Sequence, residues 1–285
     1  MWILYIIAAT LLLSLSTVLA KRGGKRADSS ITTALRTLTV VAFMWVFIFA
    51  NDLQSNISAI DSKAFLYILL TGICLFVSLL CYHISLKKGS VTGVSALQML
   101  TPILIIAVSA FTYNQTSKYY IRIICIALIA AGIILVLTQK SHSGNKNWMF
   151  FGILSSVAAV LAYSIGTEGI SVSSNILSLT LILSAVLMVS LIAVFIKGLK
   201  KGISRIPFGE IMMIVLSGIS AGLSWLCFRT AYYTGQATAV FAIISMSVAT
   251  SAVFATLFLK EKVSWKSVCG LLLIITGMLM YIFMV

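Results

Sequence analysis

Long apolar stretches, separated by short polar connections, recur along the whole chain. A bilayer span takes about 20 mainly apolar residues. Ten such stretches can be placed, at residues 2–20, 32–50, 64–86, 91–113, 119–138, 148–166, 176–196, 208–233, 236–258 and 264–284. The pattern therefore predicts an all-α polytopic membrane protein with ten transmembrane helices, and the short connections leave no room for a soluble domain.

The pattern also repeats within the chain. Residues 70–89, LTGICLFVSLLCYHISLKKG, return as residues 216–235, LSGISAGLSWLCFRTAYYTG, with seven identities in twenty positions and no gap. A constant shift of 146 residues relates the two halves, with a slip of one residue near the end. We therefore expect a duplication, with one five-helix repeat over residues 1–140 and a second over residues 147–285.

Composition agrees with a membrane protein, because 61% of the residues are hydrophobic and only 9% are charged. The net charge of +14 does not indicate a nucleic-acid partner, since 16 of the 20 Lys and Arg lie in or beside the odd-numbered connections. The exceptions are Lys63, Lys118, Arg122 and Arg229. Cationic loops are retained in the cytoplasm. We therefore expect a multi-pass protein of the cell membrane with both termini outside, its basic loops facing anionic lipid.

Equivalent connections of the two halves differ in charge. The first connection carries five basic residues, whereas its counterpart, SIGTEGISVSSN, has none and holds Glu168. Five spans per half force the second half to insert upside down, and the loop charges follow that inversion. This is the pattern of an inverted-topology repeat, which transporters use to build alternating access around a site near the membrane midplane.

No catalytic or metal-binding constellation stands out. The five cysteines all fall within predicted spans, and neither they nor the two histidines have the spacing of a metal site. Gly-rich phosphate loops, nucleophile elbows and paired carboxylates are absent from the sequence. We expect neither an enzyme nor a cofactor.

Ionisable residues inside membrane spans are functional candidates by default. His83, in the third span, and Arg229, in the eighth, occupy equivalent positions of the two repeats. Trp225 lies four residues before Arg229, so both can face the same side of a helix. The alternative is that His83 and Arg229 are independent groups at the two interfaces.

Pro102 is the one proline within a predicted span. It removes a backbone hydrogen bond and frees the carbonyl of about Gln98, so Gln98 and Thr101 form a polar cluster at membrane depth. The equivalent ninth span offers hydroxyls, among them Ser245 and Ser247, but no proline, so we expect the halves to differ here. A packing role for these small residues is the alternative.

The candidate cavity residues share a polar or aromatic side chain, or an opened backbone, within a span. They are His83, Gln98, Thr101, Pro102, Tyr163, Trp225, Arg229, Ser245 and Ser247. Arg36, near the start of the second span, is expected to extend its side chain to the interface, and a substrate role is the alternative.

Several stretches resemble the EamA repeat of the drug/metabolite transporter superfamily. They are FLKEKVSWKSVCGLLLIITGMLM, with Glu261 and glycines nine and sixteen residues later, GISAGLSWLCFRTAYYTGQATAV, and the opening STVLAKRGGKRADSSITTALR. The first half is similar through Gly89, Pro102 and Gly132, but it has Asn114-Gln115-Thr116 where the repeat usually carries an acid. The resemblance covers essentially the whole chain.

The resemblance implies ten helices, carrier-type transport and a central cavity drawn from spans 1, 3, 4, 6, 8 and 9. Many ten-span members place their termini in the cytoplasm, in contrast to the charge pattern of this chain. Small multidrug resistance relatives use a membrane-embedded glutamate in the first helix, and the first span here contains no acid. The cation-antiport mechanism of those relatives is therefore not expected.

These observations favour a secondary transporter that exports a small organic metabolite by alternating access. Few acids beside buried cations suggest an amino acid or organic anion. Alternatives are a flippase for a lipid-linked sugar or other amphipathic head group, and a membrane scaffold or accessory subunit that transports nothing. A membrane enzyme is the least favoured. The expected partners are the small-molecule substrate and the lipid bilayer, and a monomer is favoured over a homodimer.

Overall fold

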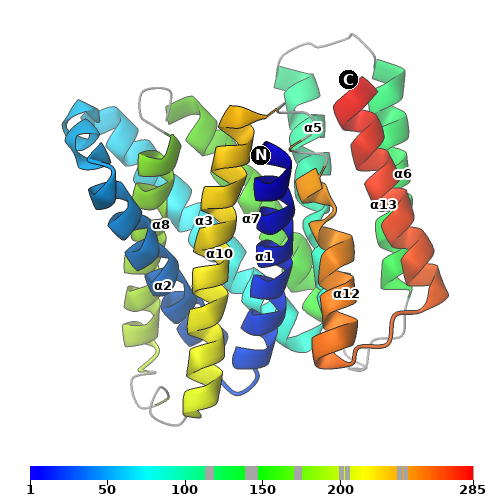
Figure 1. Ribbon diagram of the computed structural model, residues 1–285, viewed down its shortest axis with the longest axis horizontal. Helices are drawn as coiled ribbons and strands as arrows, with labels where there is room; N and C mark the ends of the chain where they lie inside the picture. Colours follow the sequence, from blue (N-terminus) through cyan, green and yellow to red (C-terminus); the bar gives the residue numbers. More distant parts are fainter. Residues whose placement is uncertain are drawn as a thin grey trace.

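The fold consists of helices joined by short connections (Figure 1). The computed structural model describes residues 1–112, 119–138, 147–169, 175–198, 202, 206–235, 240 and 243–284. Its helices are α1 (Trp2–Gly23), α2 (Ser29–Ala50), the short 3-10 helix η1 (Leu53–Ala59), α3 (Ser62–Lys88), α4 (Val91–Gln98), α5 (Leu100–Thr112), α6 (Tyr119–Leu137), α7 (Asn147–Gly169), α8 (Asn175–Ile196), α10 (Phe208–Thr234), α12 (Ser247–Leu259) and α13 (Trp265–Met284).

The helices have the length and composition of membrane spans. Among the described residues, nine helices are long and apolar enough to cross a bilayer, and Ile243–Leu259 forms a shorter apolar helix at the ninth predicted span. Large apolar side chains remain exposed along them, for example Val46, Phe195 and Leu257. Such an apolar surface suits a lipid environment. The predicted all-α polytopic fold is confirmed.

Polar residues fix where several helices begin. The Asp28 side chain accepts a hydrogen bond from the Ser30 backbone N–H and caps α2, and Asp61 accepts one from the Ala64 N–H and caps α3. Ser90 caps α4 through the Gly93 N–H. Capping of this kind satisfies backbone donors that a helix start leaves free. As a result α2 begins three residues earlier than the apolar pattern predicts.

The fourth span is interrupted rather than merely kinked. It divides into α4 and α5 at Met99, three residues before Pro102, where the Met99 N–H turns back to the Ala96 carbonyl. The ninth span has a matching interruption at Met246, whose N–H bonds to the Ile243 carbonyl. The ninth span thus makes the same tight turn without a proline, whereas the expectation that the halves differ in the polar groups they offer here stays a prediction.

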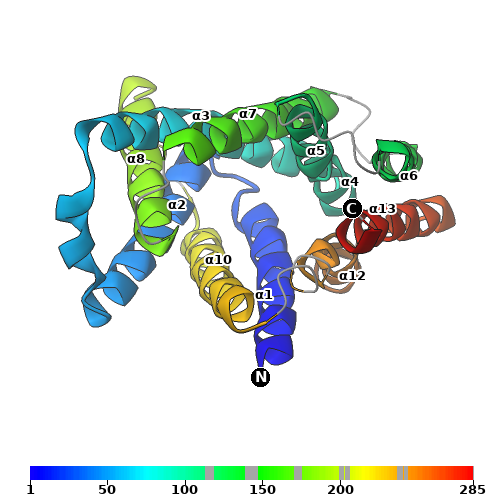
Figure 2. The ribbon, with the colours of Figure 1, turned by 90° about the horizontal axis from the view of Figure 1, so that it is seen from above.

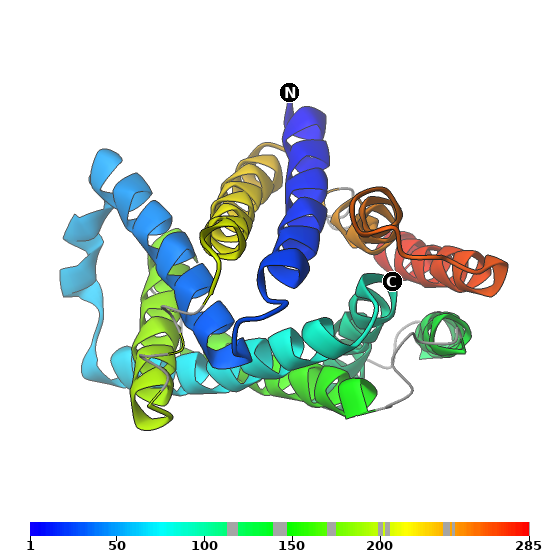
Figure 3. The same cartoon turned by 90° about the horizontal axis from the view of Figure 1, so that it is seen from below.

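Helices from opposite halves form the main pairs. In the views from above and below, α1 lies beside α10, α3 beside α7, and α6 beside α13 (Figures 2 and 3). A further pair, α2 and α8, closes the side away from α6 and α13. A shift by one repeat turns the α1–α10 pair into the α7–α3 pair, as a two-fold axis in the membrane plane requires.

Individual hydrogen bonds obey the same rule. Ser78 Oγ donates to the Ser155 carbonyl at 2.9 Å, and the equivalent Ser224 Oγ donates to the Ala9 carbonyl at 2.8 Å. Both donors and both acceptors are related by 146 residues. The contacts at the α3–α7 and α1–α10 seams are therefore one interaction made twice.

Glycines allow the backbones to approach closely at these seams. A Cβ on Gly89 would lie 2.6 Å from the Trp148 ring, and one on Gly235 would lie 2.7 Å from the equivalent Trp2 ring. The predicted boundary between the repeats, residues 141–146, lies outside the described residues, so its exact place stays a prediction.

The tightest backbone approach joins α6 to α13. A Cβ on Gly132 would lie 2.6 Å from the Gly270 carbonyl oxygen, and one on Gly270 would lie 2.6 Å from the Gly132 carbonyl oxygen. Since neither atom belongs to a flexible side chain, only a shift of a whole helix relieves the overlap.

We predict that Gly132→Ala lowers the free energy of unfolding by about 1–3 kcal/mol, the usual cost of overpacking. Gly209→Ala is the control, because nothing lies within 4 Å of its added methyl group and alanine is the better helix former. Thermal unfolding in detergent measures both variants. Equal stability of the two would contradict the close α6–α13 contact.

Candidate functional site

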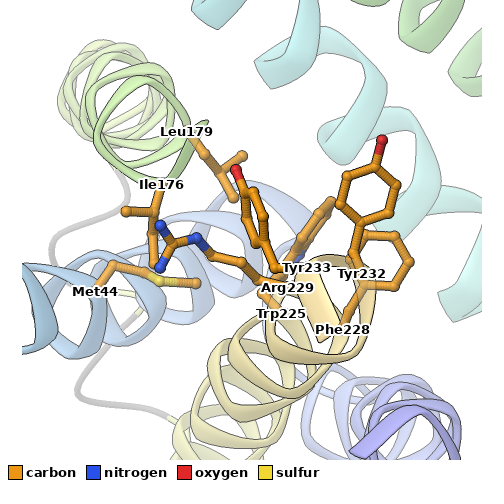
Figure 4. A pocket seen from close by; sticks show the side chains of 8 residues that line it. All are labelled: Met44, Ile176, Leu179, Trp225, Phe228, Arg229, Tyr232 and Tyr233. Atoms are coloured by element: carbon orange, nitrogen blue, oxygen red, sulfur yellow. The ribbon is translucent and has the colours of Figure 1, made fainter. Parts of the chain in front are cut away.

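A cavity of about 230 Å³ opens between α2, α8 and α10. Its walls are mainly apolar and aromatic, with a single charged side chain (Figure 4). The lining residues are Met44, Ile176, Leu179, Trp225, Phe228, Arg229, Tyr232 and Tyr233. Arg229 and Trp225 are thus the two predicted site residues that meet in this cavity.

Arg229 extends from α10 toward Met44 of α2 and Ile176 of α8 (Figure 4). Its guanidinium carbon lies 5.2 Å from the centre of the Tyr233 ring, a cation–π contact. Its Nε is buried and has no hydrogen-bond partner among the described residues. The cavity therefore presents a cationic donor beside aromatic surface, which matches a ligand with one anionic group and an apolar body.

His83 lies near the opposite side of the membrane from Arg229. The two residues sit near the ends of α3 and α10, and these helices run in opposite directions (Figure 1). His83 is only 4% exposed, and its Nδ1 is 2.9 Å from Thr33 Oγ1. It lines a void of about 10 Å³, which is room for about one water molecule. The space around His83 is therefore closed, whereas the cavity at its repeat equivalent, Arg229, is open.

The three residues predicted around the break in the fourth span do lie together. The side-chain amide of Gln98 donates to Ser155 Oγ of α7 at 3.3 Å. Thr101 Oγ1 is buried without a hydrogen-bond partner among the described residues, and Pro102 stands in the first turn of α5. They do not line the cavity at Arg229, and a substrate role for them stays a prediction.

The remaining predicted residues also lie away from that cavity. Tyr163 is 52% exposed on α7. Ser245 is buried, and the Ser247 carbonyl accepts a hydrogen bond from Ser14 Oγ of α1 at 3.1 Å. The ninth span therefore contacts α1 through Ser247, as the packing alternative predicts.

The cavity draws on helices that the resemblance did not indicate. We expected spans 1, 3, 4, 6, 8 and 9, whereas α2 and α8 are the second and seventh spans. Close packing of α2 on α10 explains the difference, because Gly218 and Gly222 lie against Thr39 and Phe43. Met44, one residue beyond Phe43, is thereby brought to the cavity. The paired glycines are the sequence signal that could have indicated this contact.

Arg36 corrects a second expectation. Its side chain does not extend to the interface but turns inward, where Nε donates to Ser217 Oγ at 3.1 Å and a terminal nitrogen donates to Ser16 Oγ at 3.0 Å. Arg36 lies about 10 Å along α2 from Ser29, at the helix start. A charged residue two turns inside an apolar helix was the signal that should have placed it among the candidates.

An ion pair ties the two halves together at the end of α1. Lys21 Nζ lies 2.7 Å from Glu261 Oε1 and donates to the Gly89 carbonyl at 2.5 Å. Glu261 also accepts from the Val91 N–H at the start of α4, where a carboxylate is favoured by the helix dipole. This is the Glu261 on which the resemblance depends.

Among the described residues, nine apolar helices of spanning length, a shorter apolar helix at the ninth span and a cavity holding the guanidinium of Arg229 are the features of a polytopic membrane protein with a binding cavity. Comparison with known proteins agrees: the model of the EamA-like transporter family matches residues 1–138 and 146–283. The chain therefore belongs to the EamA-like transporter family, and the resemblance found in its sequence is confirmed. This family points to a transporter rather than an enzyme.

Two further similarities support the family and the fold. An "uncharacterized transporter in cobO 3'region" from Sinorhizobium sp is 28% identical over 137 residues, which are 48% of this chain and 96% of that protein. A crystal structure described only as a protein has a TM-score of 0.61 and 18% identity, covering 96% of this chain and 94% of the other. At that identity the likeness shows the fold alone.

We predict that Glu261→Gln lowers the free energy of unfolding by about 1–3 kcal/mol, because it weakens charge-assisted hydrogen bonds to Lys21 and Val91. Asp52→Asn, at an exposed turn, is the control and should change little. Thermal unfolding of Lys21→Gln, Glu261→Gln and the double variant completes the cycle. Additive losses would show that Lys21 and Glu261 do not act as a pair.

Proposed function

We propose that this chain is a secondary carrier for a small organic metabolite that bears a carboxylate, such as an amino acid or an organic acid. The observation that carries the proposal is Arg229, whose Nε is buried in the cavity without a hydrogen-bond partner among the described residues. Its physical basis is the cost of an isolated charge in a nonpolar setting, which an opposite charge offsets.

A carboxylate suits the guanidinium because the two groups can form parallel hydrogen bonds. The aromatic walls would receive the uncharged part of the substrate, and a volume of about 230 Å³ limits it to a small molecule. A zwitterion or monoanion fits one cation better than a dianion does, since Arg229 is the one basic side chain among the described residues that line the cavity.

Alternating access is supported by the difference between the two ends of the molecule. The cavity at Arg229 measures about 230 Å³, whereas the void at the equivalent His83 measures about 10 Å³. Rocking of inverted repeats exchanges an open region on one side for its equivalent on the other. We infer that the protein is open at the Arg229 end and closed at the His83 end, and that transport exchanges the two.

The charge distribution supports a location in the cell membrane with both termini outside, so the Arg229 cavity faces outward. On this topology we propose export, with the substrate released from the Arg229 end. Ten spans in one chain are enough to enclose the cavity, which favours a monomer over a homodimer.

Two alternatives remain candidates for the same fold. A flippase for a lipid-linked sugar or other amphipathic head group is supported by aromatic side chains that are exposed beside the cavity, Trp225 at 45% and Tyr233 at 59%. A scaffold or accessory subunit would need neither the open cavity nor its buried cation, so the observations favour it least.

We predict that a thermal-shift screen of the purified protein finds stabilisation by an amino acid or organic acid, because a ligand that binds only the folded state raises its stability. Arg229→Ala should weaken this binding roughly tenfold to a hundredfold, as expected when a charged hydrogen bond is lost. Lys63→Ala is the matched control, since it removes an exposed cation outside the cavity.

Other outcomes of the screen separate the alternatives. Stabilisation by polyprenyl-phosphate lipid without any response to soluble metabolites would support the flippase. A stable protein partner after gentle solubilisation, with no ligand response, would support the scaffold. An Arg229→Ala variant that binds every carboxylate as tightly as the native protein would overturn the proposed role of Arg229.

We predict that a membrane-impermeant maleimide labels Asn51→Cys in intact cells but labels Lys25→Cys only after permeabilisation. Both positions are exposed and lie in successive connections, and the native cysteines lie within helices. The reverse labelling would place the termini in the cytoplasm and turn the Arg229 cavity inward.

A further inference from the structure

We propose that Arg36 forms a second anion-binding site, which receives the substrate carboxylate when the carrier opens at the opposite end. This inference rests on the proposed function, because it assumes a carboxylate substrate that binds at Arg229 before its release from that end. The proposed site is a second binding site on the transport path, and its residues come from α1, α2, α3 and α10.

Arg36 is satisfied by neutral partners. Its guanidinium donates to the hydroxyls of Ser16 and Ser217, at 3.0 and 3.1 Å. These hydroxyls in turn donate to each other's backbone carbonyls across the α1–α10 seam, both at 2.8 Å. Arg36 belongs to neither ion pair of the described residues, Lys21–Glu261 or Arg26–Glu210. The positive charge therefore has hydrogen bonds but no counter-charge.

Such an arrangement suits a site that is empty for part of a cycle. Hydroxyl acceptors prevent the cost of an unsatisfied buried cation. A carboxylate is the stronger partner, since hydrogen bonds between ionised groups are about twice as strong as neutral ones. An arriving anion can therefore displace the hydroxyls, while its departure leaves no orphaned donor.

A second polar group faces the same region from α3. His83 Nδ1 lies 2.9 Å from Thr33 Oγ1, which is three residues before Arg36 on α2. His83 is 96% buried, as its exposed fraction is 4%, and its Nε2 has no hydrogen-bond partner among the described residues. Tyr82 donates its hydroxyl to Thr17 Oγ1 at 3.3 Å. Arg36 thus lies in a polar cluster with one unused ring nitrogen.

The cluster lies directly along the helices that form the Arg229 cavity. Arg36 precedes the cavity residue Met44 by eight positions on α2, and its partner Ser217 precedes the cavity residue Trp225 by eight positions on α10. Eight residues of helix span about 12 Å. Arg229 lies twelve positions after Ser217 on α10, about 18 Å along the helix. The two cations are therefore separated by roughly 12–18 Å along these helices.

Duplication does not account for the cluster. The residues 146 positions after Ser16, Thr33 and Arg36 are Ala162, Leu179 and Ile182, all apolar. At the position of Arg36 the second half therefore has no basic residue, whereas at the position of His83 it has Arg229. We infer that Arg36 binds substrate at the His83 end of the transport path and is not part of the helix packing common to both halves.

The experiment compares exchange of radiolabelled solute by proteoliposomes of the native protein, Arg36→Gln and Arg36→Lys. The probe is a mixture of labelled L-amino acids and monocarboxylic acids, measured separately from each face. Glutamine keeps an amide donor for Ser16 or Ser217 but removes the charge, and lysine keeps the charge. Thermal unfolding without solute checks that each variant is folded.

We expect Arg36→Gln to raise the half-saturating concentration roughly tenfold at the face near Arg36, the effect of losing one charged hydrogen bond. The face near Arg229 should change less than threefold, and Arg36→Lys should restore most of the affinity. A purely structural Arg36 would instead lower the amount of active protein equally for both faces.

The outcomes are distinguishable. No exchange by the native protein, together with a silent thermal-shift screen, would overturn the proposed carrier and this site with it. Exchange by the native protein with equal half-saturation in Arg36→Gln at both faces would overturn the second site alone. If Arg36→Gln does not fold, Arg36→Lys decides: unchanged affinity at both faces, despite loss of the guanidinium fork, would also overturn the site.

Discussion

Close packing of helix backbones is the constraint on which this structure depends. In lipid, the hydrophobic effect does not drive helices together, so they are held by close van der Waals contact and by hydrogen bonds between them. Here glycines supply the close contact, as between Gly132 and Gly270, and serine hydroxyls supply the bonds, as from Ser78 and Ser224. Because the contacts occur in related pairs, each half is held by the other.

The features on which the proposed function rests are departures from that symmetry. The repeat-related helices α10 and α3 carry Arg229 in an open cavity and His83 at a much smaller void. Arg36 of the first half has no basic counterpart in the second half. Packing requires the small residues to match between halves, whereas the proposed alternating access requires the two ends to differ at any moment. In this chain the helix–helix contacts of the α1–α10 and α3–α7 pairs are repeated, whereas the polar side chains near the two ends differ.

Much of the fold could be predicted from the sequence, because apolar length and a repeat shift of 146 residues are local or periodic signals. The break at Met246 could not, since no proline marks it and the turn arises from the packed surroundings. The site was predictable only in part. Arg229 and Trp225 were found because they are unusual residues in an apolar helix.

Met44, Ile176 and Leu179 were missed because they are ordinary apolar residues whose role comes from the approach of α2 and α8 to α10. Arg36 was placed at the interface because its position in the sequence is near a helix start. Its inward direction depends on Ser16 and Ser217, which stand 20 positions before it and 181 positions after it. Such distant partners cannot be assigned from a local pattern.

The separation of partners along the chain has a consequence for biosynthesis. The hydroxyl of Ser16 bonds to a carbonyl 201 residues later, and Ala9 receives its bond from a serine 215 residues away. Helix α1 must therefore wait in the bilayer until α10, the eighth span, has been made. Its mean hydropathy of 2.3 makes it stable there on its own. Assembly of the seams is consequently a late event, governed by completion of the chain rather than by the order in which its spans are inserted.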